Sequence, residues 1–279
     1  MDLSPNICRE CHVKDSIRDN RRKPNQEDVL TIRKLTVRFG GLTAVDGMDF
    51  TIDSLSIRGV IGPNGAGKTT FFNAITGFVK PQAGEIFFQG ESILGLPSHR
   101  IASRGIIRTF QNGGVFPEMS VIENVMSGYH RLFTSSTADI MVGRRNARRE
   151  ETEMIEKAMV QLGTLGLAEA ADKLVGDLSF GQQRLVEVAR ALFSQPKILF
   201  LDEPGAGLSA GEKATLVDIL RETRQRQEQY IVLTDHSMDF IMNICDFITV
   251  MNFGRKIFEG TPGEIQSNSE VIDAYLGKE

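Results

Sequence analysis

The sequence has little of what directs a chain out of the cell or into a membrane. Only three of its 279 residues are cysteines, Cys8, Cys11 and Cys245, too few for a disulfide framework. No uninterrupted apolar run approaches the roughly 18 to 20 residues that span a bilayer. The polar segment 1–22 contains no apolar signal core. We therefore expect a cytoplasmic address.

The chain also lacks a basic excess, internal repeats and low-complexity tracts. Its formal net charge of −4 argues against a protein that coats DNA. Apolar residues make up 41% and charged residues 24%, which is ordinary for a globular protein. The length allows one large α/β domain or two small ones.

The hydrophobic pattern divides the chain into an extension and one ordered domain. Residues 1–28 are polar and poorly periodic, so we expect a poorly ordered extension. In residues 29–279, apolar strand-like runs alternate with helical patterns, which predicts parallel strands with crossover helices. Residues from about 96 to 178 are mainly helical, which predicts a helical subdomain inserted into this core. FITVMN and KIFEG, on either side of Gly254, predict a closing hairpin.

A glycine-rich turn follows the predicted strand that ends at Ile61. The segment GPNGAGKTT fits the P-loop pattern G-x-x-x-x-G-K-[ST]. Glycines let backbone N–H groups approach phosphate oxygens, Lys68 can neutralise the β- and γ-phosphates, and the Thr69 hydroxyl can bind Mg²⁺. A fortuitous glycine-rich turn is the alternative, which the strand-to-helix context disfavours. The candidate ATP-binding residues here are Gly62, Pro63, Asn64, Gly65, Ala66, Gly67, Lys68, Thr69 and Thr70.

An acidic pair ends a second predicted strand, ILFLDEP. Asp202 and Glu203 lie at its carboxyl end, the edge at which open α/β sheets bind ligands. Asp202 is suited to hold Mg²⁺, and Glu203 is suited to polarise a water beside the γ-phosphate. The alternative is an acidic turn that caps the next helix.

Between these motifs lies LSFGQQ, which resembles the ABC signature LSGGQ with Phe180 in place of the first glycine. The chain is similar to the ATP-binding cassettes of ABC transporters from about residue 30 to residue 279. That resemblance implies an α/β P-loop NTPase core of mainly parallel sheet, with an antiparallel β subdomain and an inserted helical subdomain. It also implies head-to-tail dimers that bury ATP between the subunits. The signature residues that would contact the ATP of the partner subunit are Ser179, Phe180, Gly181 and Gln182.

Three single residues match further elements of the family. Phe39 stands where an aromatic residue stacks on adenine, Gln111 where a glutamine senses Mg²⁺ and γ-phosphate, and His236 where a histidine holds the γ-phosphate. With these, the resemblance implies a catalytic set of Glu203, His236 and Gln111. The metal set would be Thr69, Gln111 and Asp202. Taken singly, each residue has an alternative: core packing for Phe39, a surface amide for Gln111 and a structural histidine for His236.

RTFQN, FPEMSVIENVM, EPGAGLSA and VIDAYLG resemble the ATPases of branched-chain amino acid importers, of the LivG type. This implies an ATPase that energises import of a small solute, with branched-chain amino acids as the first expectation. Its partners would be a second ABC ATPase subunit, in a homo- or heterodimer, transmembrane permease subunits and, indirectly, a solute-binding protein, with no nucleic acid. It would lie peripherally on the inner face of the cell membrane. The alternatives are urea, lipid or lipopolysaccharide transport, or a soluble ABC ATPase outside transport.

The sequence departs from the family at two positions. Ser209 stands at the D-loop position usually held by aspartate, and Phe180 is bulkier than glycine. We expect the backbone donors of Ser179 and Gly181 to remain available despite Phe180.

Three weaker signals have alternatives of their own. CRECH, residues 8–12, fits a haem-attachment pattern or half of a zinc site, but free thiols are the simpler expectation. The basic run 143–151 could meet anionic lipid, although a solvated helix face is favoured by its adjoining glutamates. Phe116 and Pro117 either contact a membrane subunit or close a local core.

Overall fold

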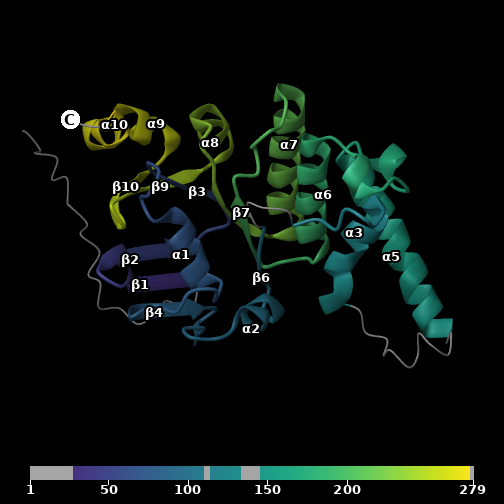
Figure 1. Cartoon of the computed structure of the whole chain (residues 1–279), viewed down its shortest axis with the longest axis horizontal. Helices are drawn as coiled ribbons and strands as arrows, with labels where there is room; N and C mark the ends of the chain where they lie inside the picture. Colours follow the sequence, from purple (N-terminus) through teal and green to yellow (C-terminus); the bar gives the residue numbers. More distant parts are fainter. Residues whose placement is uncertain (1–27, 110–113, 133–144, 277–279) are drawn as a thin grey trace, which may run out of the picture.

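The computed structural model describes residues 28–109, 114–132 and 145–276, in two sheets with flanking helices (Figure 1). The smaller sheet is antiparallel, in the order β2-β1-β4-β5. Its strands are β1 (Leu30–Phe39), β2 (Leu42–Ile52), β4 (Ala83–Phe88) and β5 (Glu91–Ser92). It lies at the amino-terminal end of the molecule, beside α1 (Lys68–Ile75).

The larger sheet has six strands in the order β10-β9-β3-β8-β7-β6. Five of them run parallel, and β10 pairs antiparallel with β9 in the expected hairpin. The strands are β3 (Ile57–Ile61), β6 (Ile106–Arg108), β7 (Ile198–Asp202), β8 (Tyr230–Thr234), β9 (Phe247–Asn252) and β10 (Arg255–Gly260). Because β3, β8 and β7 are parallel neighbours, their carboxyl ends meet at one edge, where such sheets bind ligands.

Both faces of the larger sheet are buried. Successive strand side chains point to opposite faces, so Phe200 joins the core beneath α1 while Leu199 and Leu201 join the core beneath the later helices. On the first face Phe72 of α1 packs edge-on against Phe200, with ring centroids 5.1 Å apart. These two cores hold the ligand-binding edge between rigid layers.

The helices of the middle segment are α2 (Ser98–Ser103), α3 (Val121–Ser127), the 3₁₀ turn η1 (Gly128–Arg131) and α5 (Arg145–Thr164). Of these, α3 and α5 extend away from the smaller sheet, whereas α2 lies beneath β6 (Figure 1). The described part of the basic run, residues 145–151, forms the first turns of α5. There Arg148 and Arg149 are exposed, and Arg149 pairs with Glu153 at 2.8 Å. The helix expected for this run is present, and whether its exposed face meets water or lipid stays a prediction.

The remaining helices cover the second face and the carboxyl terminus. They are α6 (Phe180–Phe193), α7 (Ala210–Gln227), α8 (Met238–Ile244), α9 (Pro262–Ser267) and α10 (Ser269–Leu276). Within the described ranges no helix is both long and apolar enough to cross a membrane.

Candidate active site

The P-loop links β3 to α1 and depends on a glycine at the start of the helix. Gly67 is the N-cap of α1 with a φ of 98°, and an added Cβ would lie 2.2 Å from the Ala44 carbonyl oxygen. The first intrahelical bond runs from the Phe71 N–H to the Gly67 carbonyl at 2.8 Å. The preceding N–H groups, at residues 68–70, therefore lack helical partners and form the anion-binding end of the helix.

Ala66 contributes differently from the other loop residues. Its backbone N–H donates to the Pro63 carbonyl at 3.1 Å, and its own carbonyl accepts from Gly254 at 3.0 Å. Both backbone groups thus bind within the protein and fix the loop against the β9–β10 turn.

The Lys68 ammonium is held inside the loop. Nζ donates to the carbonyls of Gly62 at 2.7 Å and Pro63 at 3.0 Å. Burial lowers the pKa of Lys68, while the charges of Glu203 and Asp202 act to raise it. The lysine is therefore close enough to the acidic pair for the three charges to interact.

Asp202, the last residue of β7, forms a buried ion pair that the sequence motifs did not indicate. Its Oδ2 accepts from Arg108 Nη2 at 2.7 Å, with both side chains almost fully buried. Arg108 ends the adjacent strand β6 and also donates to Asn73 Oδ1 of α1 at 2.6 Å. The Asp202 N–H donates to the Thr109 hydroxyl at 3.2 Å. The carboxylate is thereby oriented from β6 and α1 together.

Glu203 and His236 come together from the ends of adjacent strands. Glu203 Oε1 and His236 Nε2 lie 2.8 Å apart, although 33 residues separate them. Glu203 has a φ of 51°, and its N–H donates to the Thr234 carbonyl at 2.8 Å. A glutamate in this region is strained, a feature that clusters at functional sites.

Asp235, which no sequence motif indicated, connects the loop that follows Glu203 to the loop that contains His236. Its Oδ2 accepts from the Gly205 N–H at 2.9 Å and its Oδ1 from the Ser237 N–H at 2.9 Å. The side chain is 7% exposed, so these bonds satisfy a buried carboxylate. The chain just after Glu203 is therefore fixed relative to His236.

The comparison with known protein families matches a model described as ABC transporter to residues 45–206. The chain belongs to the ABC transporter family. A second model, described as branched-chain amino acid ATP-binding cassette transporter, matches residues 255–279. As a member of this family, the chain is an ATP-binding and ATP-hydrolysing transporter subunit.

Similar proteins cover almost the whole cassette. The chain is 42% identical to the high-affinity branched-chain amino acid transport ATP-binding protein BraF of Pseudomonas aeruginosa, over 90% of this chain and 98% of BraF. It is 40% identical to LivG of Escherichia coli, over 90% of this chain and 99% of LivG. A crystal structure of an ABC transporter cassette in its ADP conformation, 32% identical, superposes with a TM-score of 0.76 over 90% of this chain and 99% of that one. The expected α/β cassette fold is confirmed.

The signature segment of this ABC cassette starts α6. Ser179 is the N-cap: its hydroxyl accepts from the Gln182 N–H at 3.2 Å, and its N–H donates to Gln182 Oε1 at 3.2 Å. The expectation that the Ser179 N–H stays available was therefore wrong, because the capping box uses it. The exposed hydroxyl remains at the helix start. In Figure 1, α6 lies well apart from α1 and its P-loop.

Phe180 and Gly181 both contact the segment after Glu203. Phe180 is 65% exposed, and a Cβ on Gly207 would lie 2.5 Å from its ring. A Cβ on Gly181 would lie 2.8 Å from Glu212 Oε1 of α7. The bulky Phe180 thus fits because residue 207 has no side chain.

Arg184 joins the signature helix to the acidic pair. Its guanidinium donates to the backbone carbonyls of Asp202 and of Glu203, the latter at 2.9 Å, and pairs with Glu187. This buried arginine carries no motif of its own, so only the fold reveals the link.

The other candidate residues differ in how far the structure describes them. Phe39 ends β1 and is 50% exposed, which is inconsistent with the core alternative. Ser209 is the N-cap of α7, where its hydroxyl accepts from the Glu212 N–H at 3.3 Å. Gln111 lies outside the described residues, as do Cys8 and Cys11.

Phe116 and Cys245 differ in burial. Phe116 is 50% exposed with the Arg190 guanidinium 5.3 Å from its ring centroid, so it does not close a core. Cys245 is buried against Gly59, and burial raises the pKa of its thiol, which makes it inert.

Proposed function

We propose that this cassette hydrolyses ATP to energise import of branched-chain amino acids. The substrate rests on the names of the 40–42% identical relatives and on the match of residues 255–279 to a branched-chain amino acid cassette model. The chemistry rests on one observation, the 2.8 Å contact of Glu203 with His236 beside the P-loop lysine.

In this proposal the triphosphate lies on the first turn of α1. Lys68 leaves the Gly62 and Pro63 carbonyls for the β- and γ-phosphates, and the exposed Phe39 stacks on adenine. Glu203 accepts a proton from the attacking water. His236 orients the Glu203 carboxylate and contacts the γ-phosphate.

The donor chemistry fits Mg²⁺. This ion favours hard oxygen ligands, commonly one or two carboxylates plus phosphate and water. Thr69 on the first turn of α1 and Asp202 on β7 supply a hydroxyl and a carboxylate, and Gln111 is the third candidate. Arg108 takes one Asp202 oxygen, which leaves the other as the proposed ligand. Bound there, the ion would neutralise phosphate charge.

We further propose that the site is completed by another subunit. Ser179 caps a 14-residue helix that begins with Phe180, Gly181 and Gln182, and the N-terminus of this helix can meet the γ-phosphate of a facing cassette. That facing cassette is a second copy or a related chain. The exposed Phe116 and Pro117 would contact permease subunits, which would hold the cassette at the inner membrane face.

The test is reconstitution in vesicles with permease subunits and a solute-binding protein of a branched-chain amino acid transport system. ATP hydrolysis should rise when leucine, isoleucine or valine is supplied on the binding-protein side, and labelled leucine should enter. Lys68→Ala should abolish both. Stimulation by urea or a lipid but not by branched-chain amino acids would contradict the proposed substrate and keep the ATPase.

A further inference from the structure

Helix α6 carries a buried ion pair within two turns of the signature segment. The Arg184 guanidinium pairs with the Glu187 carboxylate one turn later, and the two residues are 7% and 4% exposed. A buried ion pair contributes little stability compared with apolar side chains of the same volume. Stability alone therefore does not account for these two charges, called here the α6 ion pair, and their other contacts show what they hold together.

On one side the α6 ion pair contacts the end of β7. Arg184 donates to the backbone carbonyls of Asp202 and of Glu203, the latter at 2.9 Å. The planar guanidinium presents its donors in fixed directions, so these bonds orient both peptides. Glu203 has a φ of 51°, and the direction of its side chain depends on that conformation. The place of the Glu203 carboxylate therefore depends on where Glu187 holds Arg184.

On the other side the α6 ion pair lies against the loop that precedes α3. A Cβ on Gly114 would lie 2.7 Å from Glu187 Oε1 and 3.0 Å from Arg190 Nη2, so a glycine is needed for this close approach. Two residues later, the centroid of the Phe116 ring lies 5.3 Å from the Arg190 guanidinium. The loop that presents Phe116 thus rests on the carboxylate that holds Arg184.

The backbone of Phe116 is tied to α3. Its N–H donates to Asn124 Oδ1 at 2.8 Å, and its carbonyl accepts from Asn124 Nδ2 at 2.9 Å. Asn124 is fully buried in α3, which packs against α6. A partner that displaces Phe116 therefore shifts the loop and α3 together against α6, so the loop does not absorb the displacement alone.

We propose that the α6 ion pair couples the surface at Phe116 to the catalytic carboxylate of Glu203. A permease subunit that shifts the loop at Phe116 displaces Glu187. Arg184 follows and reorients the Glu203 peptide. Both members of the pair are positioning residues and do not touch the nucleotide. The inference rests on the proposed function, in which Glu203 accepts the proton and Phe116 contacts a permease.

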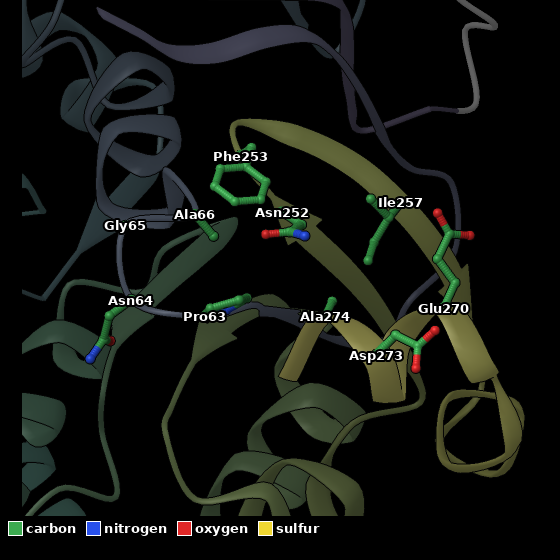
Figure 2. Close-up of a pocket in the computed structure, with 10 residues that line it drawn as sticks. All are labelled: Pro63, Asn64, Gly65, Ala66, Asn252, Phe253, Ile257, Glu270, Asp273 and Ala274. Atoms are coloured by element: carbon green, nitrogen blue, oxygen red, sulfur yellow. The ribbon is translucent and has the colours of Figure 1, made fainter. Parts of the chain in front are cut away.

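The expected effect is on chemistry rather than on ATP binding. The P-loop is supported by other elements: Figure 2 shows Pro63 and Ala66 lining one pocket with Phe253 of the β9–β10 hairpin and Ala274 of α10. Loss of the α6 ion pair should therefore leave KM for ATP unchanged. A displacement of about 1 Å at a reacting group lowers kcat roughly 100-fold.

The first test replaces both charges by apolar side chains of similar volume, which leaves no unpaired charge at either position. In Arg184→Met/Glu187→Met, measured with the partner cassette, kcat should fall roughly 100-fold. KM for ATP and the melting temperature without nucleotide should be unchanged. Arg58→Met is the control for loss of a buried arginine, because Arg58 is 6% exposed and pairs with Asp53 and Glu259 near the start of β3. It should keep its kcat.

The second test pushes on Glu187 from the loop. Gly114→Ala places a methyl group against the carboxylate and should lower kcat roughly tenfold, within the range of coupling between residues in contact. It should have no further effect in the Arg184→Met/Glu187→Met background, because Arg184 no longer carries the displacement. Gly163→Ala is the control, since a Cβ on Gly163 of α5 meets nothing within 4 Å, and it should leave kcat unchanged in both backgrounds.

An unchanged kcat in Arg184→Met/Glu187→Met would overturn the positioning role. A lower melting temperature with KM and kcat changed together would also overturn it, because that indicates general packing. An equal effect of Gly114→Ala in both backgrounds would remove the coupling. Glu203→Gln separates these failures from that of the proposed function. If Glu203→Gln loses hydrolysis while Arg184→Met/Glu187→Met keeps it, only the positioning role fails, whereas normal hydrolysis by Glu203→Gln removes the proposed chemistry itself.

Discussion

Glu203 has a backbone conformation that glutamate rarely adopts, and the contacts around it explain how that conformation persists. The Thr234 carbonyl binds its N–H, and Arg184 binds its carbonyl. Asp235 fixes the chain two residues later. The surrounding structure over-determines this one residue, which points its carboxylate at His236.

Glu203→Gln tests the role of that carboxylate. The amide keeps the shape and can still hydrogen-bond His236, but it cannot accept the proton of the attacking water. We expect hydrolysis to fall by roughly 10²- to 10⁴-fold while Mg-ATP affinity stays near wild type. Single-turnover phosphate release and equilibrium ATP binding measure the two quantities. Near-normal turnover would remove Glu203 from the catalytic role.

We predict that Arg108 is the residue that stabilises the buried carboxylate of Asp202. Replacing it by Gln leaves a buried carboxylate without its cationic partner, which typically costs about 3 to 5 kcal/mol. Urea unfolding of Arg108→Gln should show a loss of that order. Arg149→Gln is the control, because its pair with Glu153 is exposed and should contribute no measurable stability. Equal stability of the two variants would contradict the account of Arg108.

At the scale of elements, the sequence predicts the helices, strands and turns that a local residue pattern encodes. The helix after Gly67, the signature helix, the alternation of strands and helices and the hairpin at Gly254 all follow from glycine placement and periodicity. Helices α9 and α10 are short and were not predicted, because their stability depends on packing against each other and β10.

The residues that orient the site could not be predicted from the sequence, for a different reason. Arg108 meets Asp202 across 94 residues of chain, and Asp235 meets Gly205 across 30. Neither contact follows from a motif, since each depends on which strands become neighbours. The burial of Arg108 and of Asp235 can be explained only once their partners, Asp202 and the Gly205 N–H, are known.

Ser209 shows how an element tolerates a departure from its family. Both serine and aspartate are good N-caps, so α7 begins normally here. Ser209→Ala should cost about 1 kcal/mol of stability, whereas Ser209→Asp should cost almost nothing. Denaturant unfolding of the two variants side by side checks this. A larger loss in the aspartate variant would mean that Ser209 does more than cap the helix.

At the scale of the whole molecule, one chain contains the parts of an ATP site, but its signature segment lies apart from its P-loop. The P-loop, Asp202, Glu203 and His236 meet at one edge of the larger sheet. The signature lies at the start of α6, away from α1 (Figure 1). Arg184 and Phe180 nevertheless connect the signature segment to the chain around Glu203. A ligand that holds the signature of one subunit can therefore influence the acidic pair of that same subunit.

The most direct test of this account is the effect of Ser179→Arg on ATP binding and on hydrolysis, measured on the same preparation with its partner cassette. Ser120→Arg is the matched control, because Ser120 is the N-cap of α3 with the same type of capping box. Each variant loses one helix cap, worth about 1 kcal/mol. We predict that Ser179→Arg binds ATP at its own P-loop normally but no longer supports hydrolysis at the facing site, while Ser120→Arg keeps both activities. Wild-type hydrolysis by Ser179→Arg would contradict a site shared between subunits.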